Sequence, residues 1–411
     1  MKKNYLEALK WYGKAADMGN VEAKYKLGKI LLEEGKRYLK ESREQGSIAA
    51  SEFIKENLKE GNIDENESGY YIVFKSPKEF YLSADKRWDG IIEYSLDKIN
   101  WHEWSGNGIT SDTIYMRGSG NSVITGGNEW HFQTDDRLIC RGNIENLLDY
   151  ELCSRGEHPS MGKECYKSMF KGCTSLKEAP ALPARELVAG CYLGMFEGCT
   201  SLEEAPALPA TVLGDGCYAG MFKGCTSLSE APRLPAKELA KRCYHEMFKD
   251  CTSLLESPAL PATKLAEGCY YKMFSDCTSL KKASALPATK LADFCYGGMF
   301  RGCTSLEKAS ALPAIELVNG CYAGMFKDCT SLKGNIELSI KKLADFCYAS
   351  MFEGCTLLKK MPVSPVKELV DCHCYSIFKG CISLERKPVW PELSKSPDDF
   401  LMSSILKLIL Q

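Results

Sequence analysis

The stretch that decides the fold is GCYAGMFKGCTSL at Gly216–Leu228, which recurs with one change as GCYAGMFKDCTSL at Gly320–Leu332. Its second cysteine occurs nine times along the chain, each time 26 residues after the previous one. The nine positions are 173, 199, 225, 251, 277, 303, 329, 355 and 381. A fixed period of this length predicts a solenoid, in which each copy buries its apolar side only by stacking on its neighbours.

Within one copy, the apolar residues are spaced as on one side of an amphipathic helix. In RELVAGCYLGMFEGCTSL (Arg185–Leu202) they recur three and four residues apart between Leu187 and Cys199. Gly198 stands where a helix would end in the left-handed conformation. The proline-bearing SLEEAPALPA that follows predicts a strand of about three or four residues. We therefore expect each copy to be a short strand, a turn and a helix of about three turns.

The consensus CYxxMFxGCTSLxxAPALPAxxLA resembles the leucine-rich repeats of the BspA-like family of bacterial surface and parasite proteins. The resemblance runs from about Cys165 to Leu393. It implies a non-catalytic protein that binds a protein partner, with a role in adhesion, through the strand face of its solenoid. Because the period is longer than is usual in that family, we expect a bulkier helical side.

The N-terminal region has a different pattern, with two helices predicted around a Gly–Asn corner in Tyr5–Gly35. It resembles a Sel1-like repeat, a relative of the tetratricopeptide class. A shortened second copy follows, in which Gly46 matches Gly19. The resemblance implies a scaffold for protein binding, which gives an alternative function as a cytoplasmic Sel1-type scaffold.

Strand-like runs separated by turns fill the middle of the chain and predict a small antiparallel β-sandwich. The expected fold class is therefore multidomain α+β, with N-terminal α-helical hairpins, this sandwich and a C-terminal leucine-rich-repeat α/β solenoid. The expected divisions are helical repeats at 1–60, a linker at 61–69, the sandwich at 70–141, a solenoid N-cap at 142–164, the nine-copy solenoid at 165–395 and a capping helix at 396–411.

Four tryptophans of the middle segment allow two interpretations. They are Trp88, Trp101, Trp104 and Trp130. Indole rings on a surface stack on sugars, which would make the sandwich a glycan-binding module. Tryptophans also fill sandwich cores, and this is their commoner role.

The chain's 21 cysteines admit disulfide, metal and packing interpretations. On a helix, the two cysteines of one copy would lie roughly 12 Å apart, and those of adjacent helices about 8–10 Å apart. A disulfide requires Cα atoms within about 7 Å. We therefore predict buried free thiols that act as small apolar side chains. Cys372, His373, Cys374 and Cys381 could form a soft-metal site or reflect a degenerate last copy, and we predict no metal.

Composition and motifs argue against several functions. A formal net charge of −2 gives no general attraction to nucleic acid or to an anionic membrane. No apolar run is long enough for a transmembrane helix. None of the five histidines lies in a known catalytic motif, and no nucleophile triad is recognisable. We predict no catalytic residue and no cofactor. The N-terminus does not read as a signal peptide, so the expected location is the cytoplasm, or the cell surface if an upstream segment is missing.

The two residues that follow TSL in each copy vary, and they should point outward from the strand face. Their net charge is −4 over the first four copies and +5 over the next four. Such a gradient favours a dipolar protein partner, and a solvated surface without a partner is the alternative. The predicted partner-binding residues are Glu203, Glu204, Glu230, Glu256, Lys281, Lys282, Lys359 and Lys360.

Overall fold

The computed structural model describes residues 70–333, 342–360 and 376–385. All of these belong to one compact unit, residues 70–411, and a second unit comprises residues 1–69. The helical repeats predicted at 1–60, the linker at 61–69 and the capping helix at 396–411 lie outside the described residues.

A single mixed sheet opens the described chain. Its order is β3-β2-β4-β1-β6-β7, and β5 also pairs with β1. The pairings are antiparallel except for the parallel pair β6–β7. The strands are β1 (Ile72–Ala84), β2 (Ile91–Ser95), β3 (His102–Glu103), β4 (Ile109–Ser119), β5 (Trp130–Gln133), β6 (Leu138–Arg141) and β7 (Leu176–Glu178), and helix α4 (Asn146–Ser154) packs on β4.

The predicted β-sandwich is wrong. The alternation of apolar residues showed that strands have a face to bury, but it did not show what covers that face. No second sheet covers it among the described residues. Instead β6 pairs with β7 of the first repeat, and the two regions share one apolar core. Phe132 of β5 stacks on Phe170 of the first repeat, with ring centroids 5.6 Å apart. The sheet therefore caps the repeats directly.

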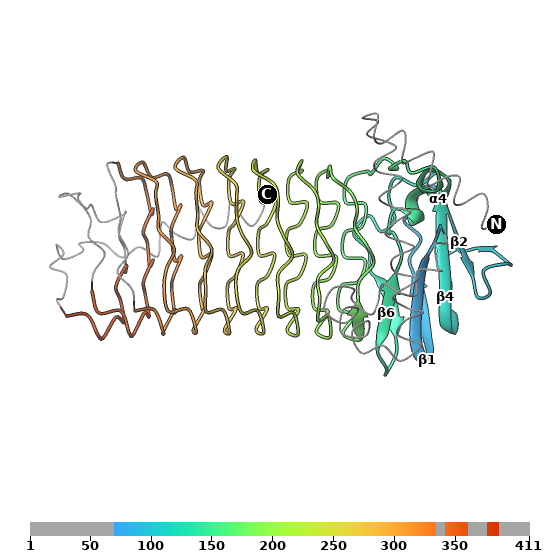
Figure 1. Cartoon of the computed structure of the whole chain (residues 1–411), viewed down its shortest axis with the longest axis horizontal. Helices are drawn as coiled ribbons and strands as arrows, with labels where there is room; N and C mark the ends of the chain where they lie inside the picture. Colours follow the sequence, from blue (N-terminus) through green and yellow to red (C-terminus); the bar gives the residue numbers. More distant parts are fainter. Residues whose placement is uncertain (1–69, 334–341, 361–375, 386–411) are drawn as a thin grey trace, which may run out of the picture. The chain divides into compact units, whose positions relative to one another are not determined.

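We call each 26-residue copy a coil and number the coils 1 to 9 by their second cysteine, from Cys173 to Cys381. The coils lie side by side in one row (Figure 1). The helices predicted within them are wrong, since α4 is the only helix among the described residues. The predicted α+β class with an α/β solenoid is wrong with them.

Backbone hydrogen bonds show what replaces the helix. The N–H of Tyr192 donates to the carbonyl of Cys217 in the next coil at 2.9 Å. The N–H of Leu193 instead donates to Gly190 in its own coil at 3.1 Å, which closes a β-turn. The alternation continues along each coil, whereas an α-helix would send every N–H to the residue four positions back. The segment is therefore a run of β-turns that hydrogen-bonds to the same run in the next coil.

A left-handed residue at every fourth position explains this choice. Gly190, Gly194 and Gly198 have φ of +64°, +59° and +75°. A helix interior excludes such residues, because left-handed residues occur singly and not within helices. The buried side chains also repeat every four residues, so their spacing resembles that of a helix.

Side chains at the left-handed positions follow a packing rule. A long side chain there lies over the next coil, where the equivalent residue is glycine. The ring of Phe294 covers Gly320, and a Cβ on Gly320 would lie 2.3 Å from the ring. Lys272 covers Gly298 in the same way, with its Cγ 3.0 Å from where a Cβ would be. Glycine is therefore required at these positions both for its conformation and for its missing side chain.

The Gly320→Ala variant tests the rule against the matched Gly216→Ala variant. Both glycines have φ near +60°, but a Cβ on Gly216 would have no neighbour within 4 Å. We expect G216A to cost about 1–2 kcal/mol of unfolding free energy for the conformation alone, and G320A to cost about 1–3 kcal/mol more for the overlap with Phe294. Urea unfolding measures both. Adding Phe294→Ala should remove the excess cost of G320A, and equal costs for the two single variants would contradict the rule.

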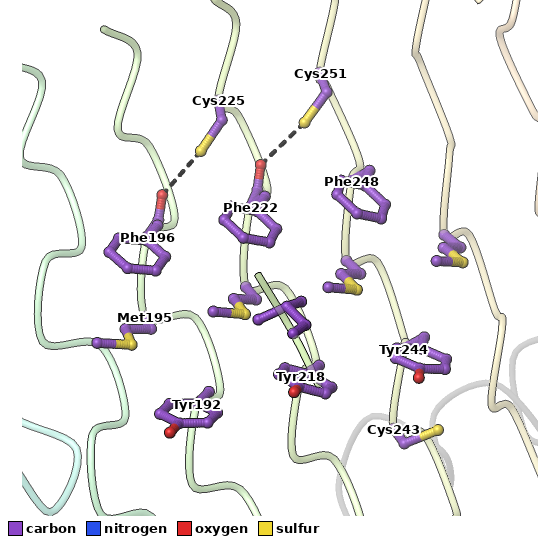
Figure 2. Packing of buried hydrophobic residues seen from close by; sticks show 14 of the residues in the cluster. Tyr192, Met195, Phe196, Tyr218, Phe222, Cys225, Cys243, Tyr244, Phe248 and Cys251 are labelled. Atoms are coloured by element: carbon purple, nitrogen blue, oxygen red, sulfur yellow. Dashed lines mark hydrogen bonds between the residues drawn. The ribbon is translucent and has the colours of Figure 1, made fainter. Parts of the chain in front are cut away.

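The interior of the stack consists of aligned columns (Figure 2). Phenylalanine rings from Phe170 to Phe378 stack with centroids 5.4–5.8 Å apart. Tyrosine rings from Tyr166 to Tyr348 stack at 5.6–6.0 Å. Beside them, the Sγ of Cys251 donates to the carbonyl of Phe222 in the preceding coil at 3.0 Å. The same column order holds each coil in one register with the next.

Candidate interaction surface

All eight predicted partner-binding residues are exposed and lie at two adjacent positions of the coils. The second of these positions forms parallel β-bridges between coils, which we call the first ladder. Glu204 bridges Glu230, Glu256 bridges Lys282, and Lys282 bridges Lys308. The structure therefore stacks Glu204, Glu230, Glu256 and Lys282 along one line, and Lys360 occupies the equivalent position in coil 8.

The first ladder juxtaposes like charges. Bridged strands lie about 4.8 Å apart, so Glu204 and Glu230 are direct neighbours, as are Lys282 and Lys308. Like charges in such positions destabilise a sheet. Where the sign changes, Lys282 Nζ lies 2.6 Å from Glu256 Oε1. An exposed pair of this kind contributes roughly 0–1 kcal/mol, so it does little to offset the repulsion on either side.

A second ladder, which the sequence analysis missed, has the opposite character. It bridges Glu238 with Lys264 and Glu316 with Lys342, so acidic and basic residues face each other. Lys264 and Glu238 form an ion pair. The signal in the sequence was a position before the leucine that is charged in most coils, as in Lys237-Glu238-Leu239, although Val212 occupies it in one. The second ladder brings opposite charges together, whereas the first ladder also brings like charges together.

The cysteines offer no reactive group in the described coils. Apart from Cys153 and Cys381, the described cysteines are buried, and none is in a disulfide. Burial raises the pKa of the Cys191 and Cys225 thiols to about 12, so the thiolate, which is the reactive form, is not populated at neutral pH. The distance argument against disulfides was wrong, because the coils have the spacing of β-strands and not of helices.

Metal ligands do not gather in the described part of the chain, which holds no group of three or more candidate side chains. Three of the four residues proposed for a soft-metal site, Cys372, His373 and Cys374, lie outside the described residues. The fourth, Cys381, donates its Sγ hydrogen to the carbonyl of Phe352 at 3.0 Å.

Three of the four tryptophans belong to the core. Trp88 and Trp104 stack with ring centroids 5.1 Å apart, and Trp130 meets Trp104 edge-on at 5.0 Å. All three are buried, so they offer no face to a sugar. The glycan-binding interpretation loses their support.

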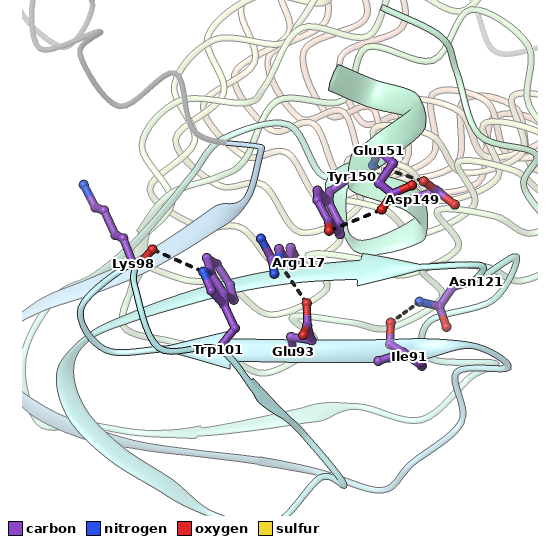
Figure 3. Close-up of polar contacts among 9 residues, drawn as sticks. All are labelled: Ile91, Glu93, Lys98, Trp101, Arg117, Asn121, Asp149, Tyr150 and Glu151. Carbon is purple, nitrogen blue, oxygen red and sulfur yellow. Dashed lines mark hydrogen bonds and ion pairs between the residues drawn. The ribbon is translucent and has the colours of Figure 1, made fainter. Parts of the chain in front are cut away.

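Trp101 lies outside this core, and a cation already covers it (Figure 3). The guanidinium of Arg117 lies 4.0 Å from the centre of the Trp101 ring and 4.3 Å from that of Tyr150 in α4. Arg117 Nε also donates to Glu93 at 2.8 Å. Arg117 therefore links the sheet to α4, and its guanidinium is already engaged by Trp101, Tyr150 and Glu93.

Within residues 70–333, 342–360 and 376–385, no helix is long and apolar enough to cross a membrane.

Comparison with protein families gives one match. A model described as a BspA type leucine rich repeat region (6 copies) matches residues 194–333 and 270–406, which together cover more than half of the chain. No curated protein and no solved structure matches the chain. The Sel1-like resemblance of the N-terminal region receives no match and stays a prediction.

Proposed function

Because the chain belongs to the BspA-type leucine-rich repeat family, we propose that it is a non-catalytic protein that binds a protein partner through its first ladder. The family implies protein interaction or adhesion in general terms. The choice of the first ladder comes from its charges, which are exposed, aligned and segregated by sign along the coils.

One observation carries the proposal: of the three bridges that each ladder forms among the described residues, two join like charges on the first ladder and two join opposite charges on the second. The ladder positions are exposed, and their residues play no part in the buried columns, so packing does not require this arrangement. A partner with basic groups opposite Glu204 and Glu230, and acidic groups opposite Lys282 and Lys308, would neutralise both ends. Complementary potentials of this kind set orientation and association rate.

The test reverses the gradient without changing the net charge. In the variant Glu203→Lys/Glu204→Lys/Lys359→Glu/Lys360→Glu, the acidic end becomes basic and the basic end acidic. The control, Glu238→Lys/Lys264→Glu, swaps one pair on the second ladder and is also neutral overall. Proteins from the native cell are captured on the full chain and on both variants, and their amounts compared by quantitative mass spectrometry.

A partner that uses the first ladder should be depleted about tenfold or more by the quadruple variant and retained by the control. Its affinity for the wild-type chain should weaken with added salt, because exposed charges are screened. A partner whose affinity and salt dependence are the same for all three chains would contradict the proposal.

The place of action is part of the same proposal. A surface adhesin would be cleaved when intact native cells are treated with protease, whereas a cytoplasmic Sel1-type scaffold would be protected. The adhesin is the form that we propose, since adhesion accompanies this repeat family. Full protection in intact cells, with cleavage after lysis, would favour the scaffold.

A further inference from the structure

Coils 4 and 5 break the packing rule of the left-handed positions. Elsewhere in the described coils, a charged residue at such a position is followed by glycine in the next coil. Glu246 is instead followed by Lys272, and Asp250 by Asp276, all four with φ between +51° and +62°. Coils 4 and 5 therefore both carry side chains at left-handed positions that are mostly glycine in the other described coils.

An aromatic pair lies at the same place. His245 of coil 4 stacks on Tyr271 of coil 5, with centroids 5.3 Å apart and planes 17° apart. The equivalent residues on either side are Ala219 and Gly297. A Cβ on Gly297 would lie 2.9 Å from the Tyr271 ring, so the ring leans over that glycine. The pair is a half-buried planar step flanked by small residues.

Basic groups predominate around His245. Burial lowers the pKa of its imidazole, and Glu246 is the nearby acid that opposes this shift. The basic groups that lower the pKa further are Arg242, Lys272 and Lys223. The carboxylate of Glu246 is engaged by Lys223 at 3.3 Å. The positive side chains around the imidazole therefore outnumber the acids.

Tyr271 has similar surroundings. Burial raises the pKa of the Tyr271 hydroxyl, nearby Glu246 raises it further, and the nearby cations Arg301 and Lys249 oppose the shift. Lys272 Nζ lies 5.1 Å from the centre of the Tyr271 ring. Neither Lys272 nor Arg301 has an ion-pair partner among the described residues. Two cations beside an aromatic step are thus available to an external anion.

We propose that this surface, formed by coils 4 and 5 with Arg301 of coil 6, binds an acidic segment of a partner protein. Carboxylates of the segment pair with Lys272 and Arg301, and its planar groups lie against the His245–Tyr271 step. The surface belongs to the turn run of the coils, so it is a second contact beyond the first ladder. Charge complementarity with Lys272 and Arg301 favours an acidic segment, whereas Asp250 and Asp276, one turn further along the coils, would repel it and so limit the surface on that side.

Binding of fluorescein-labelled decaglutamate to the full chain, followed by fluorescence anisotropy at pH 7.5 and low salt, tests the proposal. Lys272→Gln/Arg301→Gln should weaken binding about tenfold. The matched control Lys264→Gln/Lys290→Gln removes the same charge at exposed positions of the second ladder and should change affinity by less than about twofold. Absence of binding to the wild-type chain, or equal weakening by both variants, would overturn the proposal.

The pH dependence gives an independent readout. Protonation of His245 adds a positive charge among Arg242, Lys272 and Lys223, with Glu246 as the nearby acid. Because burial lowers the pKa of His245, affinity for decaglutamate should rise only as the pH falls below the ordinary histidine pKa of about 6.5, in a range where glutamate side chains, with a pKa of about 4.3, are still mostly ionised. His245→Gln should remove the rise. An equal rise in that variant would overturn the role of His245.

Discussion

Above about pH 9 the protein is expected to lose stability steeply and to unfold by about pH 10 to 11. Burial raises the pKa of thiols such as Cys191 and Cys225 to about 12, whereas a thiol in an unfolded chain has a pKa of about 8.5. Between these values the unfolded chain releases protons that the folded chain keeps, so the free energy of unfolding falls as pH rises. Each such thiol lowers it by about 1.4 kcal/mol per pH unit.

The effect is large because the thiols recur in every coil. A typical domain has only about 5–15 kcal/mol of stability in total, and several thiols titrating together exhaust it within one or two pH units. Buried tyrosines such as Tyr192, whose pKa burial also raises, add to the loss at higher pH. Below about pH 8 the thiols are protonated in both states and contribute no slope.

Urea unfolding at pH 7, 8, 9 and 10 measures the slope directly. Cys269→Ala/Cys295→Ala removes two buried thiols and should make the slope shallower by about two protons per molecule, whatever it does to stability at pH 7. The slope is the readout, so a general loss of packing does not imitate the effect. A wild-type slope equivalent to fewer than about two protons at pH 9.5 would show that the thiols are not buried together.

Phe248→Ala is expected to be the most damaging single substitution among those in the interior. Phe248 lies in the middle of the phenylalanine column, stacked at 5.6 Å on Phe222 and at 5.5 Å on Phe274. Deleting a buried phenyl ring costs about 3–5 kcal/mol, and two stacked neighbours lose a partner at once. The measured quantity is the urea unfolding free energy at pH 7.

Leu255→Ala is the control in the same coil. Leu255 is 47% exposed on the strand face, so its truncation should cost less than about 1 kcal/mol. If F248A cost no more than L255A, the column would not be a continuous core. A lower denaturant slope in F248A would instead indicate that the stack unfolds in two parts at the altered coil.

The repeat pattern predicted the stacking of the coils and the exposed charges. It was misleading about the helix, because an α-helix and this run of β-turns both place buried residues about four positions apart. Buried pairs at Cys191–Tyr192 and Met195–Phe196 recur every four residues, close to the helical period. The distinguishing signal was a glycine at every fourth position, of which Gly198 was taken as a helix end. The predicted β-sandwich was wrong for another reason. The alternation of apolar residues in β1 shows that one face is buried, but it does not show whether a second sheet or a repeat covers that face.

The sequence alone placed the predicted partner residues at two adjacent exposed positions of the coils, because a strict period aligns equivalent positions. The opposite-charge second ladder needed the structure, since only its β-bridges show that Glu238 faces Lys264. The step at His245 and Tyr271 was also out of reach. It becomes visible only once the left-handed columns are known, because a helix would have placed these side chains on an ordinary polar face.

The glycines under Phe294 and Lys272 show that the residue at a left-handed position in one coil restricts which residue can follow at the same position in the next coil. Except at coils 4 and 5, a coil with a charged left-handed residue is followed by one with glycine at that position, so the coils are not interchangeable. Deleting coil 5, for example, would place Phe294 directly after Arg242 and so set two bulky residues in succession. An array that is shortened by design should therefore lose coils whose removal leaves a glycine after each bulky left-handed residue.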